Sequence, residues 1–422
     1  MQRIFVAAFI VFASSSAFAQ FANVKLDERT ADNIANETAV AINPKNPLNI
    51  VAASARDNVY HSFDGGKTWK SSKMTSPFGV YGEPVVVADS KGTFYYFHLS
   101  GTSGESVEGI VCQTSSDGGV TWDGGSQVGT TPGKNPHKPA ACVDPKGNLV
   151  VTWTQFDKYG NPDAACGSNV LISTSSNGKK WSKPIRISNR NGNCLDDNSA
   201  PGGASTATTD DKKVFVAWAH EGKLYIDRSF DNGGMWLSND IEIGSQNGGM
   251  NLKIPGHPRG NGMPVLQIDR SKKQSSGLLY LAWADQRNGE DDTDVWFLRS
   301  NNYGDYWTSP LKIGASEKGT HQYLPGMAVD NTSGYIYIVY YDRGGYDDSR
   351  TDVMLAYSTD NGTSFKTVKV SNEPIVPDGN ASFGDHLTIA AHKGIIVPVW
   401  TRLDNGVTSV WTAVFRHDDL PK

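Results

Sequence analysis

Short apolar runs that end in Asp or Asn recur along the chain, and each is followed by a turn and a second apolar run. The first runs cover residues 39–43, 85–89, 140–144, 265–269 and 326–330, and the second runs cover 94–97, 149–153, 214–218, 279–283 and 336–340. Short runs rich in β-branched and aromatic residues, bounded by turn residues, predict β-strands. No segment shows the sustained period of an amphipathic helix. The pattern therefore predicts an all-β protein.

An octapeptide recurs downstream of these runs. Its first copy is SFDGGKTW at residues 62–69, and further copies begin at residues 115, 175, 229, 300 and 358, the one at 175 in a shortened form. Asp or Asn in a tight turn accepts hydrogen bonds from nearby backbone N–H groups, and Gly permits the positive φ that such turns need. The final aromatic ring packs between neighbouring sheets. The octapeptide therefore predicts a hairpin turn with a structural role rather than a catalytic site.

Each octapeptide lies between a third and a fourth strand, so that one repeat of 53 to 71 residues supplies four antiparallel strands. This is typical of a β-propeller blade. A seventh unit, at 386–415, has three strands and no octapeptide. We expect the N-terminal segment 23–26 to supply its outer strand and close the ring, which leaves no exposed edge. The prediction is one seven-bladed propeller domain over residues 20–422; the alternative is six blades with the last unit as an appendage.

The octapeptide closely resembles the Asp box, or BNR repeat, of sialidases and related propellers. The resemblance covers residues 23–416 and indicates an exported bacterial relative within the sialidase superfamily, because sialidases proper have six blades. In catalytic members of that superfamily, three arginines hold the substrate carboxylate, a Tyr activated by Glu is the nucleophile, and an Asp serves as acid and base. If this chain is an enzyme, the resemblance implies a glycosidase of the exo-sialidase type.

The N-terminal residues predict export. A basic start, an apolar run at 4–12 and a small-residue cleavage signature at 17–19 are typical of a signal peptide covering residues 1–19. We expect a secreted or periplasmic protein without membrane insertion. The net charge of −5, with 20% charged residues, gives no sign of a nucleic-acid partner.

The four cysteines permit disulfides in an exported chain. Cys166 and Cys194 both lie in long loops of the third repeat, and we predict that they are bonded to each other. Cys112 and Cys142 either pair or remain buried thiols. The cysteines are not spaced as a CxxC pair, so the sequence does not indicate a zinc or redox motif.

Functional side chains of a propeller gather on the face opposite the octapeptide turns, around the central funnel. We expect the innermost strands to begin with Glu37, Glu83, Lys138, Ala200, Met263, Leu324 and the pair Asp385-His386. Four arginines fall at nearly equivalent places after the second strands: Arg56, Arg287, Arg343 and Arg402. They predict a cationic arc on one side of the funnel, faced by Glu83, Lys138 and His220.

These positions divide into two groups of candidates. The catalytic candidates are Asp57 as the acid, Tyr341 as the nucleophile, and Glu83. The ligand-binding candidates are Arg56, Arg287, Arg343, Arg402, His220 and Asp285. In the structural alternative, the arginines pair with Asp285, Asp342 and Asp404 and stiffen turns. No family motif fixes these roles, because Asn36-Glu37-Thr38-Ala39 stands where an Arg-Ile-Pro type motif is expected.

Two functions from different classes stay open. The first is a propeller that recognises an acidic glycan or glycoprotein at the funnel and cleaves it as a glycoside hydrolase or a lyase; the second is a binding or scaffolding propeller without chemistry. Neighbouring arginine charges favour an anionic ligand. No cofactor or metal is predicted: the acidic loops at 290–294 and 347–349 offer oxygen ligands for calcium but lack a spaced ligand pattern. The sequence indicates no particular oligomeric state.

Overall fold

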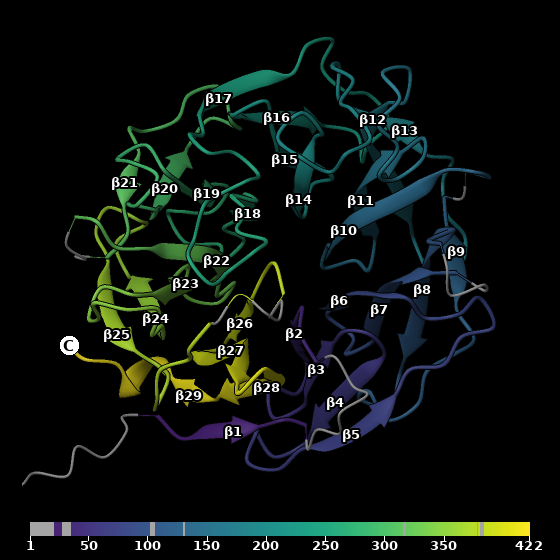
Figure 1. The fold of residues 1–422 in the computed structure, drawn as a ribbon. Coiled ribbons are helices and arrows are strands. Elements are labelled where there is room, and N and C mark those ends of the chain that lie inside the picture. Colours follow the sequence, from purple (N-terminus) through teal and green to yellow (C-terminus); the bar gives the residue numbers. More distant parts are fainter. Residues whose placement is uncertain are drawn as a thin grey trace, which may run out of the picture.

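The computed structural model describes residues 21–27, 35–101, 106–129, 131–314, 318–377, 379 and 384–422. In these residues the chain forms seven antiparallel sheets around a central axis (Figure 1). Six sheets have four strands and the seventh has five. Helical structure in the described part of the chain is limited to the 3-10 helix His417–Asp419. The prediction of an all-β, seven-bladed propeller is confirmed.

The blades follow one another in chain order, and the first strand of each lies nearest the axis (Figure 1). Blades 1 and 2 contain β2 (Ala39–Ile42), β3 (Ile50–Ser54), β4 (Asn58–Ser62), β5 (Lys70–Lys73), β6 (Gly82–Ala88), β7 (Phe94–Ser100), β8 (Gly109–Ser115) and β9 (Ser126–Val128). Blades 3 and 4 contain β10 (Asn135–Val143), β11 (Leu149–Phe156), β12 (Ser168–Ser175), β13 (Ile185–Arg186), β14 (Gly202–Thr208), β15 (Val214–His220), β16 (Lys223–Ser229) and β17 (Ile241–Ser245). Blades 5 and 6 contain β18 (Val265–Ile268), β19 (Leu279–Asp285), β20 (Asp294–Ser300), β21 (Leu311–Lys312), β22 (Gln322–Val329), β23 (Ile336–Asp342), β24 (Asp352–Ser358) and β25 (Lys366–Lys369).

Blade 7 joins the two ends of the chain. It contains β26 (Thr388–His392), β27 (Ile395–Asp404), β28 (Val407–Ala413) and β29 (Phe415–Arg416), and its outer strand is β1 (Asn23–Lys25), which pairs antiparallel with β28 (Figure 1). Phe21 stacks on Phe415 with ring centroids 4.1 Å apart. The expected ring closure by the N-terminal strand is confirmed, and the last unit is a blade rather than an appendage.

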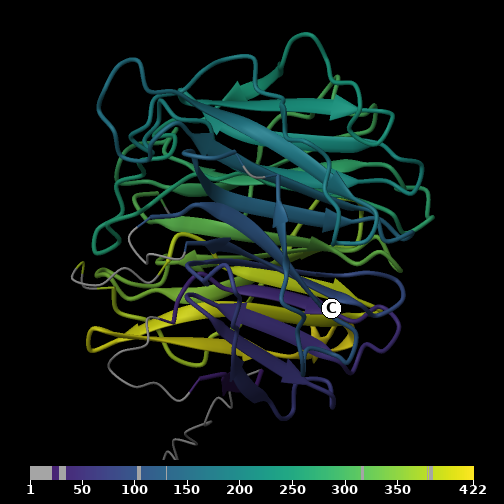
Figure 2. The same ribbon diagram turned by 90° about the vertical axis from the view of Figure 1, so that its right-hand side faces the viewer.

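The octapeptides form the turns between the third and fourth strands. In blade 1, Ser62 Oγ accepts a hydrogen bond from the N–H of Gly66 (2.9 Å), and Asp64 Oδ1 accepts one from the N–H of Thr68 (2.9 Å). Gly66 has a φ of +83°, and a Cβ there would collide with Val414 of blade 7. Seen from the side, the strands run between the two faces of the ring (Figure 2). The antiparallel order therefore places these turns on the face opposite the starts of the innermost strands.

The cysteines follow the sequence-based prediction. Cys166 and Cys194 form a disulfide, and Cys112 and Cys142 are free thiols. Disulfides persist in oxidising compartments, which fits an exported protein. The predicted signal peptide lies outside the described residues. Within the described part of the chain, no helix is long and apolar enough to span a membrane.

Candidate functional site

A repeated backbone feature marks the start of the innermost strands. In blades 2, 3, 4 and 6 the pairing of the first and second strands shifts at a bulge whose first residue has a positive φ. These residues are Glu83 (49°), Lys138 (53°), Gly203 (64°) and Leu324 (51°), and Glu37 (53°) holds the same place in blade 1. A positive φ costs a non-glycine residue about 1 kcal/mol or more, and such strain concentrates at functional sites. In blade 4 the residue at the start of the innermost strand is thus Gly203, not Ala200 as the sequence analysis expected.

A cavity of about 870 Å³ opens on the funnel face, opposite the octapeptide turns. Seven charged residues line it, from the starts of the innermost strands of blades 3 and 7 and from loops: Lys138, Asp196, Lys253, Arg259, Glu290, Asp291 and Asp385. A narrower channel of about 440 Å³ continues along the axis between the innermost strands of all seven blades. Lys138, Asn261 and Asp385 line both spaces, so they lie where the cavity meets the channel.

Carboxylates connect the residues at this junction through hydrogen bonds and ion pairs. Glu83 Oε2 accepts a hydrogen bond from the backbone N–H of Lys138 (2.5 Å), and Asp196 forms an ion pair with the Lys138 ammonium. Arg259 Nη2 lies 3.7 Å from Asp196 Oδ2 and 4.0 Å from Asp385 Oδ2. His386 Nδ1 donates to Asp385 Oδ1 at 2.9 Å. Three carboxylates therefore face three cationic groups, and a fourth carboxyl, that of Glu37, acts on them from blade 1.

The local field separates the acid strengths of two neighbouring carboxyl groups. Burial, reinforced by the negative charges of Asp385 and Glu83, raises the pKa of Glu37 to about 8. Burial also acts to raise the pKa of Asp385, but the hydrogen bond and charge of His386, followed by the charges of Lys138 and Arg259, hold it well below its usual range. At neutral pH Glu37 is therefore protonated beside an ionised Asp385. Such a split is the usual sign of an acid and a base in one site.

The neighbouring imidazole and ammonium keep their protons. Burial works to lower the pKa of His386, but the hydrogen bond to Asp385 and the negative charges around it raise that pKa to about 8. For Lys138 the charges of Asp196, Asp385 and Glu83 outweigh burial and raise its pKa. Both groups are therefore cationic at neutral pH.

An aromatic side chain forms one wall of the cavity. Tyr159, on the loop between β11 and β12, stacks on His137 with ring centroids 4.0 Å apart and an interplanar angle of 20°. Its hydroxyl donates to Asp196 Oδ2 at 2.9 Å. The cavity lining also includes His257 and His321. Burial lowers the pKa of each of these histidines to about 4, with a further lowering by the charge of Arg343.

Comparison with known proteins supports the fold alone. No protein-family model and no curated protein matches this sequence. Among solved structures, the chain is similar to a Hadza microbial sialidase, with 13% identity over 90% of this chain and 76% of that one and a TM-score of 0.50. It is also similar to a GH93 α-L-arabinofuranosidase of Fusarium graminearum in complex with arabinobiose (14% identity, 96% and 99% coverage, TM-score 0.53) and to a protein of unknown function from Dyadobacter fermentans (12% identity, 93% and 97% coverage, TM-score 0.52).

The chain has a sialidase-like propeller fold. Both the sialidase and the arabinofuranosidase match nearly the whole of it. At these identities the likeness concerns the fold, so the chemistry of this sialidase-like propeller has to be argued from its own side chains.

Of the predicted site residues, the structure brings Glu83 to the funnel, where it contacts blade 3 as described above. Asp57 and Arg56 lie in the turn between β3 and β4, where Asp57 forms an ion pair with Lys73 (2.8 Å) and Arg56 is exposed. Tyr341 is 1% exposed, and its hydroxyl donates to the carbonyl of Thr401 (2.8 Å). Burial raises its pKa well above the usual range, which does not suit a nucleophile. Neither Asp57 nor Tyr341 is among the described residues that line the cavity.

The predicted ligand-binding residues are held within their own blades. Arg287 makes a two-pronged contact with Asp285 (2.6 and 2.9 Å), and Asp285 also accepts from Trp283 Nε1 (2.8 Å). Arg402 pairs in the same way with Asp404 (2.9 Å). His220 is buried beside the carbonyl of Ser199, 3.2 Å from its Nε2.

Arg343 differs from the other two arginines. It is 4% exposed, its Nε donates to Thr351 Oγ1 (3.1 Å), and its guanidinium lies 5.5 Å from the centroid of the Tyr323 ring. No member of the expected cationic arc is among the described residues that line the cavity. The pairing alternative describes the contacts of Arg287 and Arg402, because each guanidinium is hydrogen-bonded to an Asp two residues away in its own blade. Their binding roles stay predictions.

The sequence analysis missed three cavity residues that lie on loops, Tyr159, Asp196 and Arg259, and also His137, on which Tyr159 stacks. A signal for Arg259 exists in the spacing of the octapeptides, because the longest interval, 71 residues, contains the loop between β17 and β18. Long loops on a rigid scaffold carry functional residues disproportionately often.

Proposed function

We propose that this protein is a glycoside hydrolase that holds an acidic glycan in the funnel cavity, with Glu37 as the proton donor and Asp385 as the ionised carboxylate. The observation that carries the proposal is a pair of interacting carboxyl groups whose pKa values are shifted in opposite directions, one of which, Asp385, lies where the cavity meets the channel. Glycosidases need one protonated and one ionised carboxyl group on either side of the scissile bond.

Glu37 supplies the acid function in this proposal. Its proton is retained at neutral pH because ionisation would place another negative charge beside Asp385 and Glu83. On transfer to the glycosidic oxygen, the proton would leave a carboxylate that the neighbouring His386 and Arg259 charges stabilise.

Asp385 supplies the ionised partner. It accepts from His386 and faces Arg259, so its carboxylate is held in one orientation and stays ionised. Asp196 is a second ionisable candidate on the cavity, because both carboxylates lie within 4.0 Å of the same Arg259 nitrogen. Their nearest oxygens are therefore at most about 8 Å apart, an upper limit that is compatible with a glycosidase carboxyl pair.

Arg259 is the group best placed to receive the acidic part of a ligand. Its side chain is 53% exposed in the cavity, and its contacts with Asp196 and Asp385 are longer than direct hydrogen bonds. A guanidinium in that state can still bind a carboxylate or sulfate bidentately. Tyr159 adds a ring surface on the adjacent wall.

A panel of glycans tests the proposal. The purified chain is assayed for release of reducing ends from sialylated, uronic-acid and sulfated oligosaccharides, and from arabino-oligosaccharides, because the matched structures include a sialidase and an arabinofuranosidase with arabinobiose. Hydrolysis of an acidic member is expected, with a loss of about 100-fold or more in Glu37→Gln and Asp385→Asn.

Asp348→Asn is the matched control, because Asp348 is an exposed carboxylate that pairs with Arg350. It should leave hydrolysis unchanged. Binding of an acidic glycan by calorimetry without any hydrolysis would support the alternative, a binding propeller. Absence of both binding and hydrolysis over the whole panel would refute the proposal.

A further inference from the structure

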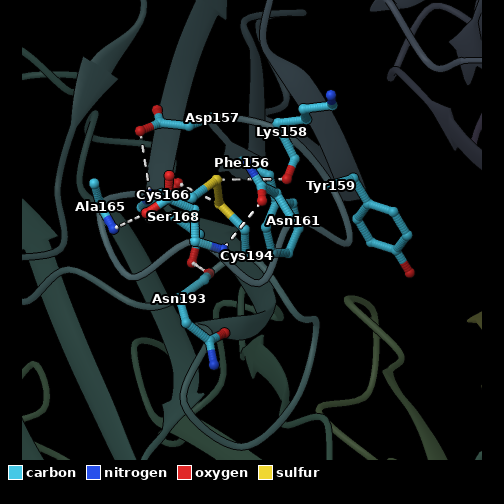
Figure 3. Close-up of a disulfide and its surroundings, with 12 residues drawn as sticks. Phe156, Asp157, Lys158, Tyr159, Asn161, Ala165, Cys166, Ser168, Asn193 and Cys194 are labelled. Atoms are coloured by element: carbon cyan, nitrogen blue, oxygen red, sulfur yellow. Dashed lines mark hydrogen bonds between the residues drawn. A yellow bond between two sulfur atoms is a disulfide. The ribbon is translucent and has the colours of Figure 1, made fainter.

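The disulfide lies next to the cavity rather than in a remote part of the fold. Cys166 is on the loop between β11 and β12, and Cys194 is on the loop between β13 and β14, which leads into blade 4. Figure 3 shows the two loops joined by the sulfur–sulfur bond, with Tyr159 on the first loop and Asn193 beside Cys194 on the second. Both loops also carry residues that line the cavity, namely Tyr159 and Asp196.

Backbone hydrogen bonds extend the connection on both sides of the disulfide. The N–H of Gly160, next to Tyr159, donates to the carbonyl of Cys194 at 2.7 Å. Ser168 Oγ donates to the carbonyl of Asn193 at 2.5 Å (Figure 3). The two cysteines are buried in a small apolar cluster with Phe156 and Ala200. The two loops therefore behave as one body rather than as two independent loops.

Asp196 depends on this support. It has a φ of +54°, an unfavourable conformation for a residue with a Cβ, and it follows Cys194 by only two residues. A conformation of that kind persists where the surrounding structure imposes it. Its carboxylate accepts from Tyr159 and Lys138 and faces Arg259, so a change in its backbone would release three partners at once.

We propose that the Cys166–Cys194 disulfide is a positioning device for the funnel site, which holds Tyr159 and Asp196 where they orient Lys138 and Arg259. The inference concerns the same cavity as the proposed function, but it does not depend on the reaction proposed there. Cys166 and Cys194 are positioning residues in this account, since neither lies among the groups that would touch a ligand.

Release of Asp196 should have an electrostatic consequence at His386. Asp196 partly neutralises Lys138 and Arg259, and these two cations also act on Asp385, the partner of His386. If Asp196 moves away, the positive field at the imidazole increases and the pKa of His386 falls from its value of about 8.

The experiment follows the His386 imidazole by NMR titration in the full mature chain labelled at histidine. In Cys166→Ala/Cys194→Ala, which removes the bond but keeps apolar side chains in the cluster, the titration midpoint of His386 should fall by about half a pH unit or more. Asp196→Asn removes the charge directly and should shift the midpoint in the same direction.

Cys142→Ala is the matched control, because Cys142 is a free thiol in β10 of the same blade. It should lower thermal stability while leaving the midpoint near that of the wild type. A double variant that melts at a lower temperature but keeps the wild-type midpoint would show that the disulfide is only a stabilising link, and would overturn the proposal.

Equal shifts in the double variant and in Cys142→Ala would overturn it too, because the effect would then be general loosening. If the double variant does not fold, reduction of the folded wild-type chain by a phosphine gives the same measurement without a substitution. No glycan is needed, so failure here and failure of the proposed hydrolysis are distinguishable.

Discussion

Around the funnel, one backbone position carries very different side chains in the two halves of the ring. This position lies two places before the uninterrupted pairing of the first and second strands begins. In blades 7, 1, 2 and 3 it holds His386, Glu37, Glu83 and Lys138, whereas in blades 4, 5 and 6 it holds Gly203, Met263 and Leu324. The first four form the charged half of the funnel and the last three the apolar half. The positive φ occurs in both halves, at Glu83 and Leu324 alike.

The bulge alone therefore does not make a site. In the apolar half the bulge serves packing, since a Cβ on Gly203 would approach Met263 Cβ to 2.7 Å. In the charged half the same backbone brings ionisable groups together. The apolar half contributes to the cavity through loops, one of which, the long loop between β17 and β18, carries Arg259 across to Asp196 and Asp385.

The largest expected difference between the halves is in hydrolysis. Asp385→Asn keeps the size of the side chain but removes the ionised carboxylate, so the rate on the glycan identified by the panel should fall by about 100-fold or more. Leu324→Ala, at the position of blade 6 equivalent to His386 next to Asp385, should change the rate by less than about threefold. Initial rates on variants shown to be folded by circular dichroism check both values. Similar losses in the two variants would remove the distinction between the halves.

The two halves should also differ in how much a substitution changes the free energy of unfolding. Lys138→Met removes a buried ammonium and leaves Asp196 without its closest cation, so the free energy of unfolding should fall by about 3 kcal/mol. Met263→Leu, in the apolar half, conserves volume and should cost less than about 1.5 kcal/mol. Denaturant titration of both variants measures the difference. An unchanged stability in Lys138→Met would mean that the charged half is hydrated rather than buried.

Binding of an acidic ligand in the charged half should weaken as the pH becomes alkaline. Glu37 and His386 both have a pKa raised to about 8, so both hold their proton at pH 7. As pH rises through 8, Glu37 gains a negative charge and His386 loses a positive one, and the site becomes more negative by two charges. The affinity for an acidic oligosaccharide such as oligogalacturonate should therefore fall about tenfold between pH 7 and pH 9. Calorimetry at the two pH values checks this, and a neutral oligosaccharide should show little change.

Arg259 should distinguish acidic from neutral ligands. Arg259→Gln is expected to weaken binding of an acidic oligosaccharide about tenfold while changing the affinity for a neutral one much less. Arg350→Gln is the control, because Arg350 pairs with Asp348 outside the cavity. Equal effects of the two substitutions would place the acidic group elsewhere, and Arg343 would be the next residue to test.

The smallest effect comes from blade 4, outside the funnel. Burial raises the pKa of Asp227 to about 7, so the folded state binds this proton more tightly than the unfolded chain does. The contribution is favourable at low pH and is lost as pH rises through 7. Asp227→Asn keeps an oxygen for the N–H groups of Arg228 and Leu237 and should raise the free energy of unfolding at pH 8 by about 1 kcal/mol. Its pH dependence should be independent of Glu37.

The fold was predictable because its signals are local. The octapeptide turns and the apolar runs repeat within each blade, and the unpaired segment at 23–26 required a partner at the other end of the chain. The inner-strand starts were predictable for the same reason, so that Glu37, Glu83, Lys138 and the Asp385-His386 pair could be named from the repeat.

The rest of the site could not be predicted, because it depends on loops that follow no period. Asp196, Tyr159 and Arg259 meet only in three dimensions, through the disulfide and the long loop between β17 and β18. The arginines after the second strands gave a regular pattern, but a carboxylate two residues away satisfies Arg287 and Arg402 within their own turns. A pattern shared between blades can thus serve local stability as well as a common ligand.

The most direct test of the central claim is the titration of Glu37 itself. Carbon-13 NMR of the side-chain carboxyl, assigned by comparison with Glu37→Gln, follows its protonation in the wild-type chain. We expect a titration midpoint of Glu37 near pH 8, with Asp385 ionised throughout the titration. A midpoint near the ordinary value of 4.5 would mean that both carboxyl groups are ionised at neutral pH, and would contradict the assignment of Glu37 as the acid of the site.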